Sequence, residues 1–276
     1  MRVVIIGGGF IGKQVFKNLN NSNKVKKCVL IPRKVIDLTK QKSINQLKLK
    51  LKPKDIIFFT AAKAPVKNNY MLLQNIKIAT NFCEAVKDIK NLTFYYLSSD
   101  AVYKDSKKLL TEDSITQPDS LHGIMHLSRE IIFRNCFKKN LSFLRPTLVY
   151  GLNEPHNGYG PNSFFRKAIR NQSIRLFGKG EELRDHISIN DVSKIIALII
   201  IKKKIGVFNI VTGKRISFYD IAKSIIKITS SKSKIEFVKR QGPIPHNGFR
   251  IFNNTKLMSI IKKYKFHSLK NTFLNN

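Results

Sequence analysis

The amino-acid sequence predicts an α/β fold, a doubly wound parallel sheet with a smaller second lobe, and three observations support this prediction. Short β-branched runs alternate with longer stretches of helical periodicity, the pattern of parallel strands joined by helices. The chain has 276 residues, a length that suits one large α/β domain or two unequal lobes. Apolar residues make up 42% of the chain, which supplies a packed core and excludes a disordered protein.

The order of these runs predicts the elements of the sheet. We expect strands at residues 2–6, 26–31, 55–60, 93–97, 141–144 and 206–211, and helices at residues 10–19, 68–87 and 121–138. Beyond residue 151 the chain becomes rich in Gly, Pro and Asn, which indicates a lobe of different texture. We therefore expect a first domain of residues 1–151, to which residues 187–211 return, and a smaller lobe of residues 152–186 and 212–276.

The net charge of +34 has two possible origins. A strongly basic chain is typical of proteins that bind nucleic acid or an anionic membrane surface. Here, however, 39 of the 51 basic residues are Lys, scattered along the chain, whereas readers of phosphates and bases favour Arg. A genome rich in A and T would produce this lysine excess without any binding function. We expect no specific nucleic-acid partner, and at most a weak attraction for anionic ligands.

The cysteines and the hydrophobic runs favour a cytoplasmic protein. The longest apolar run, residues 195–201, is far shorter than the roughly 20 residues that span a bilayer, and predicts a buried helical segment. The N-terminus shows no cleavage-site pattern. The three cysteines, Cys28, Cys83 and Cys136, have neither disulfide nor zinc spacing, so we expect buried free thiols in a reducing compartment and no metal.

A glycine turn at the N-terminus predicts a dinucleotide site. Gly7, Gly9 and Gly12 satisfy the pattern G-x-G-x-x-G between the first strand and the first helix. In this pattern the first Gly permits the tight turn, the second lets the backbone approach a pyrophosphate, and the third lets helix and strand pack closely. The free N–H groups at the start of the helix then face the anion.

The end of the second strand bears on which dinucleotide binds. An acidic residue about 20 residues after the glycines would hold the ribose 2′-hydroxyl of NAD. The segment at residues 29–34 contains no acid, and Arg33 with Lys34 would suit a 2′-phosphate. The sequence therefore leans towards NADP, with NAD as the alternative.

Further motifs extend this pattern along nearly the whole chain. They are the turn ending in Gly9-Phe10-Ile11-Gly12, Asp37-Leu38-Thr39, the strand that ends in Ala61-Ala62, Asn75, Leu97 to Tyr103, Arg145 to Gly151, Gly178-Lys179-Gly180, Arg184 to Val192, and Phe208 to Ile210 followed by Ser217. In this order they resemble the extended short-chain dehydrogenase/reductases, also called NAD-dependent epimerase/dehydratases. One departure is the glycine turn, which is a residue shorter than the usual G-x-x-G-x-x-G, with Ile6 at the first position.

The resemblance implies a Rossmann domain followed by a substrate-binding lobe, and an NAD(P)-dependent epimerase or reductase of nucleotide-linked sugars, in surface-polysaccharide synthesis. It implies that Arg184 clamps the substrate diphosphate, with Phe164 and Arg250 in the same cleft. A homodimer through the helices near 68–87 and 121–138 is a further expectation. The cofactor residues implied are Gly7, Gly9, Phe10, Ile11, Gly12, Arg33, Asp37, Leu38, Ala61, Ala62, Lys63, Asn75 and Pro146.

The catalytic motif departs from the family. Its Tyr-x-x-x-Lys pair is replaced by His122 and His126, which share one face of the expected helix. Three interpretations are open. His122 could be the acid/base, with His126 on the cofactor ribose and Ser99 orienting the sugar. Alternatively, the protein binds nucleotide or nucleotide sugar without turnover, in a regulatory role. A metal site is the third, although no further ligand stands at the usual spacing.

Neighbouring residues narrow the chemistry. Asp100 stands where family dehydratases carry an Asp-Glu pair, but Ala101 replaces the second acid, so dehydration is disfavoured. Asp100 is either catalytic or a solvated residue at the strand end. Two other Tyr-x-x-x-Lys strings exist, Tyr103 with Lys107 and Tyr219 with Lys223. We expect the first in a loop and the second in a late helix, neither beside the cofactor.

Overall fold

The computed structural model describes residues 1–274 and divides the chain into two compact units. Unit 1 contains Met1–Lys104, Ser114–Pro146 and Ser193–Phe208. Unit 2 contains Asp105–Asp113, Thr147–Val192 and the chain from Asn209 onward. The short segment at Asp105–Asp113, which interrupts unit 1, is a feature that the sequence analysis did not anticipate.

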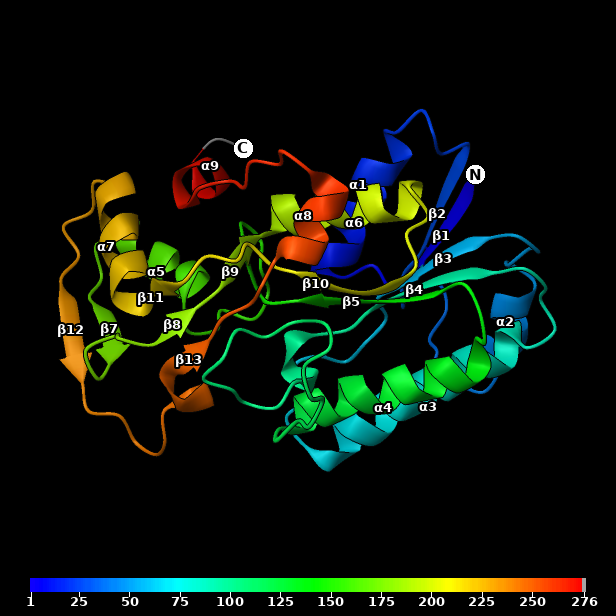
Figure 1. Cartoon of the computed structure of the whole chain (residues 1–276), viewed down its shortest axis with the longest axis horizontal. Helices are drawn as coiled ribbons and strands as arrows, with labels where there is room; N and C mark the ends of the chain where they lie inside the picture. The colour runs from blue at the N-terminus through cyan, green and yellow to red at the C-terminus, as the bar shows by residue number, and fades with distance from the viewer. Residues whose placement is uncertain (275–276) are drawn as a thin grey trace. The chain divides into compact units, whose positions relative to one another are not determined.

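Unit 1 is built on a six-stranded sheet with the strand order β10-β5-β4-β3-β1-β2, and the five strands from β1 to β5 pair in parallel (Figure 1). This confirms the predicted doubly wound sheet. The strand ends agree with the expected ranges to within one or two residues. The bounds are β1 Arg2–Ile6, β2 Lys27–Ile31, β3 Ile56–Phe59, β4 Thr93–Leu97, β5 Leu141–Pro146 and β10 Gly206–Ile210.

Helices cover the sheet of unit 1. In Figure 1, α3 (Asn69–Val86) and α4 (Leu121–Cys136) run together along one face, and α1 (Phe10–Asn20) lies on the other. Each of the three expected helices is therefore present. A short helix α2 (Ser43–Lys48) was not predicted. The apolar run at residues 195–201 forms the end of α6 (Ile189–Ile201) and is largely buried, as expected.

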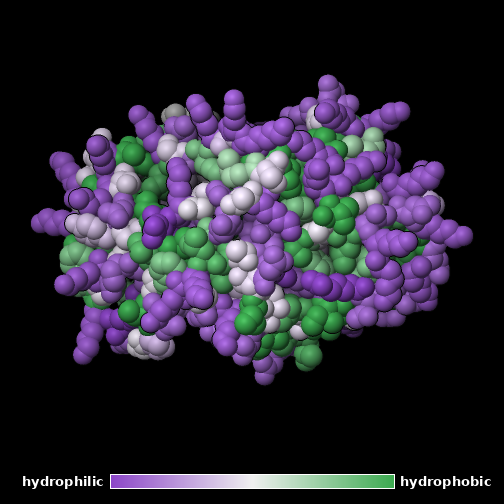
Figure 2. Space-filling view, in the orientation of Figure 1, coloured by the Kyte–Doolittle hydropathy of each residue, from purple (hydrophilic) through white to green (hydrophobic). Residues whose placement is uncertain are grey.

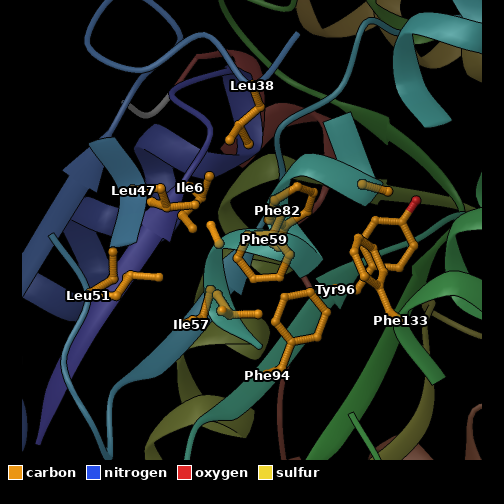
Figure 3. Packing of buried hydrophobic residues seen from close by; sticks show 14 of the residues in the cluster. Ile6, Leu38, Leu47, Leu51, Ile57, Phe59, Phe82, Phe94, Tyr96 and Phe133 are labelled. Atoms are coloured by element: carbon orange, nitrogen blue, oxygen red, sulfur yellow. The ribbon is translucent and has the colours of Figure 1, made fainter. Parts of the chain in front are cut away.

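Aromatic rings fill the core between the sheet and helices α3 and α4 (Figure 3). The ring of Phe59 on β3 lies 4.6 Å from that of Phe82 on α3 and 5.3 Å from that of Phe133 on α4. Phe94 and Tyr96 on β4 complete the cluster, because residues two apart on a strand face the same side. Ring pairs at these distances add to the stability that burial supplies. This core fixes α4 against β3 and β4.

A buried ion pair ties α4 to the carboxyl ends of two strands. The carboxylate of Glu130 accepts two hydrogen bonds from Arg145 at the end of β5, at 2.9 and 2.6 Å. It also accepts a hydrogen bond of 2.7 Å from Ser98, just beyond β4. Both charged side chains are almost fully buried. The pair thus sets the position of the helix relative to the strand ends that carry Ser99 and Pro146.

Replacing Arg145 by Leu should lower the free energy of unfolding by about 3–5 kcal/mol, because it leaves the Glu130 carboxylate buried without its counterion. Denaturant titration of both proteins measures the difference. Asp88→Ala is the matched control, because Asp88 pairs with Lys48 at 2.7 Å on the surface. Such a pair is worth little, so the unfolding midpoint should stay unchanged. Equal effects of the two substitutions would contradict this assignment.

Unit 2 consists of small sheets and short helices. The strand pairs are β6 (Leu148–Tyr150) with β9 (His186–Ser188) and β7 (Ile174–Phe177) with β12 (Ile235–Val238), both parallel. A third sheet has the order β11 (Ile216–Ser217), β8 (Leu183–Arg184), β13 (Phe249–Arg250). Helices α5 (Pro161–Ala168), α7 (Phe218–Ile228) and α9 (Leu269–Phe273) surround its core, and α8 (Thr255–Ile261) also belongs to this unit.

A buried imidazole lies in unit 2. The ring of His186 meets the ring of Phe218 edge-on at 5.4 Å, and the residue is only 9% exposed. Burial, helped by the nearby charge of Arg184, lowers the pKa of His186 to about 3. The unfolded chain takes up this proton near pH 6.5, and the folded protein does so only near pH 3. Folding stability is therefore lost as the pH falls through this window.

The variant His186→Phe should lose less stability in acid than the wild type. Between pH 6.5 and pH 4 the difference in unfolding free energy should grow by about 1.4 kcal/mol for each pH unit. Denaturant titrations across this range measure it. His156→Phe, at an exposed position of the same unit, should retain the wild-type slope. Parallel profiles for the wild type and His186→Phe would contradict this, because they would show that folding does not lower the pKa of His186.

Two surface properties complete the fold. In Figure 2 hydrophilic side chains project all over the visible face, with small groups of hydrophobic residues between them. Within residues 1–274, none of the helices is long and apolar enough to cross a bilayer.

Cys28, Cys83 and Cys136 are free, as expected, but each is half-buried rather than buried. Cys136 Sγ lies 3.9 Å from the carbonyl oxygen of Cys83, where α3 and α4 meet.

Candidate active site

The glycine turn between β1 and α1 brings three backbone segments into contact. Gly7 has φ = +116°, and a Cβ at this position would lie 2.6 Å from the nitrogen of Ala61. A Cβ at Gly12 would lie 2.2 Å from the carbonyl oxygen of Gly7. At Gly9 a Cβ would meet nothing within 4 Å. Gly7 and Gly12 are thus required by the fold, whereas Gly9 keeps open the space beside the helix N-terminus.

A cavity of about 620 Å³ opens beside this turn. Its walls come from the turn, from the segment after β2, and from the end of β3. Among the residues predicted to bind the cofactor, it is lined by Gly7, Gly9, Arg33, Asp37, Leu38, Ala61, Ala62 and Lys63. A cavity of this size, bordered by backbone N–H groups at a helix N-terminus, has the room and the polarity for a dinucleotide.

The other predicted cofactor residues do not line the cavity. Asn75 on α3 is fully buried, accepts a hydrogen bond from the backbone nitrogen of Lys63 and donates one to its oxygen, both at 2.9 Å. It therefore shapes the segment after β3. Phe10, Ile11 and Gly12 form the first turn of α1. Pro146 is the buried last residue of β5.

The segment after β2 carries a charged pair. Arg33 contacts the carboxylate of Asp37 at 3.3 Å, and Thr39 donates two hydrogen bonds to the same carboxylate, at 3.1 and 2.7 Å. Although partial burial acts in the opposite direction, these bonds and the guanidinium lower the pKa of Asp37. Arg33 is largely exposed and Lys34 also lines the cavity, so both cations can reach a ligand phosphate.

Helix α4 carries the two histidines. The side chain of Ser120 caps the helix by accepting a hydrogen bond from the nitrogen of Gly123, which places His122 and His126 in its first turns. Gly123 has a close packing role, since a Cβ there would lie 2.2 Å from the Ala101 oxygen. The two imidazole rings lie edge to face, with their centroids 4.7 Å apart. The helix therefore presents both rings together, as the spacing predicted.

His126 is held in the core by Tyr96, a residue that the sequence analysis did not single out. The Tyr96 hydroxyl lies 2.8 Å from His126 Nδ1. Burial raises the pKa of the Tyr96 hydroxyl and lowers that of His126 well below its usual value, with the charges of His122 and Arg129 adding to the effect on the imidazole. His126 is thus neutral, and its Nδ1 is engaged with the Tyr96 hydroxyl.

Ser99 and Asp100 follow β4 directly. Ser99 Oγ accepts a hydrogen bond from the Ala101 nitrogen at 3.1 Å and donates one to Asp100 Oδ1 at 3.3 Å. Asp100 is only 8% exposed, so it is not a solvated strand-end residue. In unit 1, α4 thus supplies His122 and His126, and the end of β4 supplies Ser99 and Asp100.

The predicted substrate residues belong to unit 2. Arg184 on β8 and Arg250 on β13 are register partners of neighbouring parallel strands, so their side chains share one face. Arg250 donates a hydrogen bond of 2.8 Å to Asp105 Oδ1, which also contacts His246 Nδ1 at 2.5 Å. Phe164 lies in the core of this unit and is 1% exposed. Sequence reasoning missed Asp105 and His246, because no motif marks them.

The two other Tyr-x-x-x-Lys strings lie in the kinds of segment that the sequence predicted. Tyr103 follows a short turn at the end of β4, outside any helix, and Tyr219 with Lys223 lies on α7 in unit 2. For the described part of the chain, no group of three His, Cys, Asp or Glu residues could hold a metal ion.

Gly9→Ala should separate binding from folding. A methyl group there meets no protein atom, so the substitution should behave like one at an exposed position. The free energy of unfolding should therefore stay within about 1 kcal/mol of the wild-type value. The same methyl group should weaken NADH and NADPH binding at least tenfold, since it occupies the approach to the helix N-terminus. Fluorescence titration measures both affinities. Gly158→Ala, also in open space, is the control and should bind as the wild type.

Comparisons with known proteins agree with this geometry. GDP-6-deoxy-D-talose 4-dehydrogenase of Aggregatibacter actinomycetemcomitans is 28% identical over 284 residues, which cover 98% of this chain and 95% of that protein. ADP-L-glycero-D-manno-heptose-6-epimerase of Brachyspira hyodysenteriae is 26% identical over 270 residues, covering 86% and 84%. The structure of UDP-glucose 4-epimerase from Thermus thermophilus in complex with NAD superimposes with a TM-score of 0.82 and 19% identity, covering 99% and 97%. A model of the NAD dependent epimerase/dehydratase family matches residues 3–211, and the chain belongs to that family.

Proposed function

We propose that this protein is an NAD(P)-dependent epimerase or reductase that acts on a nucleotide-linked sugar, in the synthesis of a surface polysaccharide. The observation that carries the proposal is the cavity at the glycine turn, lined by eight of the predicted cofactor residues. Relatives that span nearly the whole chain include a GDP-sugar dehydrogenase and an ADP-sugar epimerase by name, which supports a nucleotide sugar as substrate.

The cofactor would be held by the glycine turn and by the segments after β2 and β3. Backbone N–H groups at the start of α1 would face the pyrophosphate, and Asp37 with Leu38 would border the adenosine. Arg33 and Lys34 lean the site towards NADP, although Asp37 already engages the Arg33 guanidinium. The bound nicotinamide would accept or return the hydride, and the protein would move the proton.

His122 would be the acid/base. An imidazole accepts the proton of the sugar hydroxyl while the hydride leaves the same carbon, and returns a proton when the carbonyl is reduced. No lysine is needed for this role, because an imidazole titrates near neutral pH without a neighbouring cation. Ser99, whose hydroxyl is oriented by Asp100 and the Ala101 nitrogen, would hydrogen-bond the reacting oxygen.

His126 would have a different task from the lysine that it replaces. Its Nδ1 is occupied by Tyr96 and its ring is 6% exposed, so it lies in the core beneath His122. Because the His126 ring is neutral, it would not take the proton that His122 transfers. It would instead hold His122 in place by packing against it, with the two ring centroids 4.7 Å apart. The same burial also favours the second candidate, a binding protein without turnover, since no charged group from this position reaches the cofactor.

The substrate lobe corresponds in this proposal to unit 2. Arg184 and Arg250, register partners on β8 and β13, would bind the diphosphate through their guanidinium groups, although one nitrogen of Arg250 already donates to Asp105. The nucleoside diphosphate would contribute the anion and the sugar would carry the reacting carbon. Phe164, which is 1% exposed, would support this lobe from its core, where its ring meets those of Tyr159 and Phe218 at 5.2 and 6.3 Å, rather than contact the substrate.

A homodimer and a cytoplasmic location complete the proposal. The helices α3 and α4 expose large hydrophobic residues, which supports pairing through this face. These residues are Tyr70, Leu73, Ile124 and Ile131, with exposed fractions from 38 to 66%.

His122→Ala decides between the enzyme and the silent binding protein. With NAD⁺ or NADP⁺ and a set of GDP-, UDP- and ADP-linked sugars, or with NADH or NADPH and the corresponding keto sugars, the wild type should change the nicotinamide absorbance at 340 nm. The variant should lose at least about a hundredfold in kcat, because general acid–base catalysis contributes that much, and should keep the cofactor affinity. His156→Ala, at an exposed position of unit 2, should retain the wild-type rate. Bound cofactor that no substrate oxidises or reduces, in wild type and variant alike, would establish the binding protein instead.

A further inference from the structure

Arg129 on α4 is a buried cation in an aromatic cage. The residue is 0% exposed. Its guanidinium carbon lies 5.2 Å from the ring centre of Phe59, 5.0 Å from that of Tyr96 and 5.8 Å from that of Phe133. Figure 3 shows these three rings gathered in one part of the core. Interactions between a cation and a ring face stabilise the charge, but only in part.

No carboxylate neutralises this charge among the residues that the structure describes. The ion pairs within residues 1–274 do not include Arg129, and its neighbour Glu130 turns to Arg145 instead. The remaining partners of the guanidinium are the sulfur of Met125 at 3.6 Å and a single backbone oxygen. Arginine remains protonated in proteins, so the fold carries an uncompensated charge at a cost of several kcal/mol. An apolar side chain would fill the same cage without that cost.

The one strong hydrogen bond of Arg129 leads to the cofactor cavity. Nη2 donates to the carbonyl oxygen of Ala61 at 2.7 Å. Ala61 lines the cavity, and its backbone is the surface against which Gly7 packs. The guanidinium therefore connects the helix of the two histidines with the strand end and the glycine turn that form the dinucleotide site.

The charge also acts on the groups beside the histidines. After burial and His122, Arg129 is the next influence that lowers the pKa of His126. Burial lowers the pKa of the guanidinium itself, and the Tyr96 hydroxyl and the Cys83 thiol act in the opposite direction. Arg129 is thus a buried cation that acts on the imidazole at the position from which the lysine is absent.

We propose that Arg129 is a positioning residue of the dinucleotide site, whose buried guanidinium fixes the Ala61 carbonyl and supplies, from beneath the site, the positive charge that the helix position of His126 no longer provides. The inference rests on the proposed cofactor binding and extends it to a residue that does not touch the cavity. The benefit of this costly charge would then lie in binding rather than in folding.

Arg129→Met tests the proposal, because methionine fills the cage without a charge or a donor. The affinity for NADH or NADPH, measured by fluorescence titration, should fall about tenfold, as expected for the loss of a hydrogen bond from a charged donor. The free energy of unfolding should stay equal to that of the wild type or rise. Arg129→Lys keeps a charged donor near Ala61 and should restore most of the affinity.

Arg134→Met is the matched control. Arg134 lies on the same helix, its guanidinium stacks on Phe143 at 5.0 Å, and it is exposed. Its loss should leave cofactor binding unchanged.

The remaining outcomes each decide the question. Wild-type affinity in Arg129→Met, or loss of its folded state, would overturn the proposal, because the charge would then be idle or needed for folding. Equal weakening in the Lys variant would show that the guanidinium shape alone matters, and would overturn the role of the charge. If the wild type itself binds neither nucleotide, the proposed function fails, and with it this inference.

Discussion

The buried carboxylate of Glu130 is the interaction on which the site depends. It accepts hydrogen bonds from Arg145 on β5 and Ser98 beyond β4, and so fixes helix α4 against the carboxyl ends of two neighbouring strands. The positions of the candidate catalytic residues follow from this placement of the helix. His122 and His126 stand two turns and one turn before Glu130 on the same helix, and Ser99 follows Ser98 on the chain. A shift of the helix would move them together.

Two adjacent residues on α4 show opposite electrostatic arrangements. Glu130 is a buried charge with a bidentate partner, which is the arrangement that a folded protein tolerates. Arg129 is a buried charge that has only a carbonyl oxygen, a sulfur and three ring faces around it. The first arrangement stabilises the position of the helix. The second arrangement is costly for folding. Its hydrogen bond to Ala61 connects this buried charge with the lining of the cofactor cavity.

The high positive charge contributes little to this chemistry. The cavity at the glycine turn is bordered by four cations, Arg33, Lys34, Lys63 and, on the first turns of α1, Lys13. Arg33 is partly engaged by Asp37, and Lys63 by Gln74. Arg184 and Arg250 are buried side chains that are placed by strand register. In Figure 2 hydrophilic side chains project over the visible face between groups of hydrophobic residues, as a compositional lysine excess would leave it.

The sequence by itself determined the features that rest on local geometry. The strand–turn–helix with its glycines, the alternation of strands and helices, and the shared face of His122 and His126 all follow from residues close together in the chain. Only the tertiary structure decided which distant groups meet. Tyr96 reaches His126 across 30 positions, Arg129 reaches Ala61 across 68, and Asp105 reaches Arg250 across 145. It also turned Asn75 towards the Lys63 backbone and left the cysteines half-buried. The physical reason is that such contacts depend on how whole helices pack on the sheet, and no periodicity or motif encodes that packing.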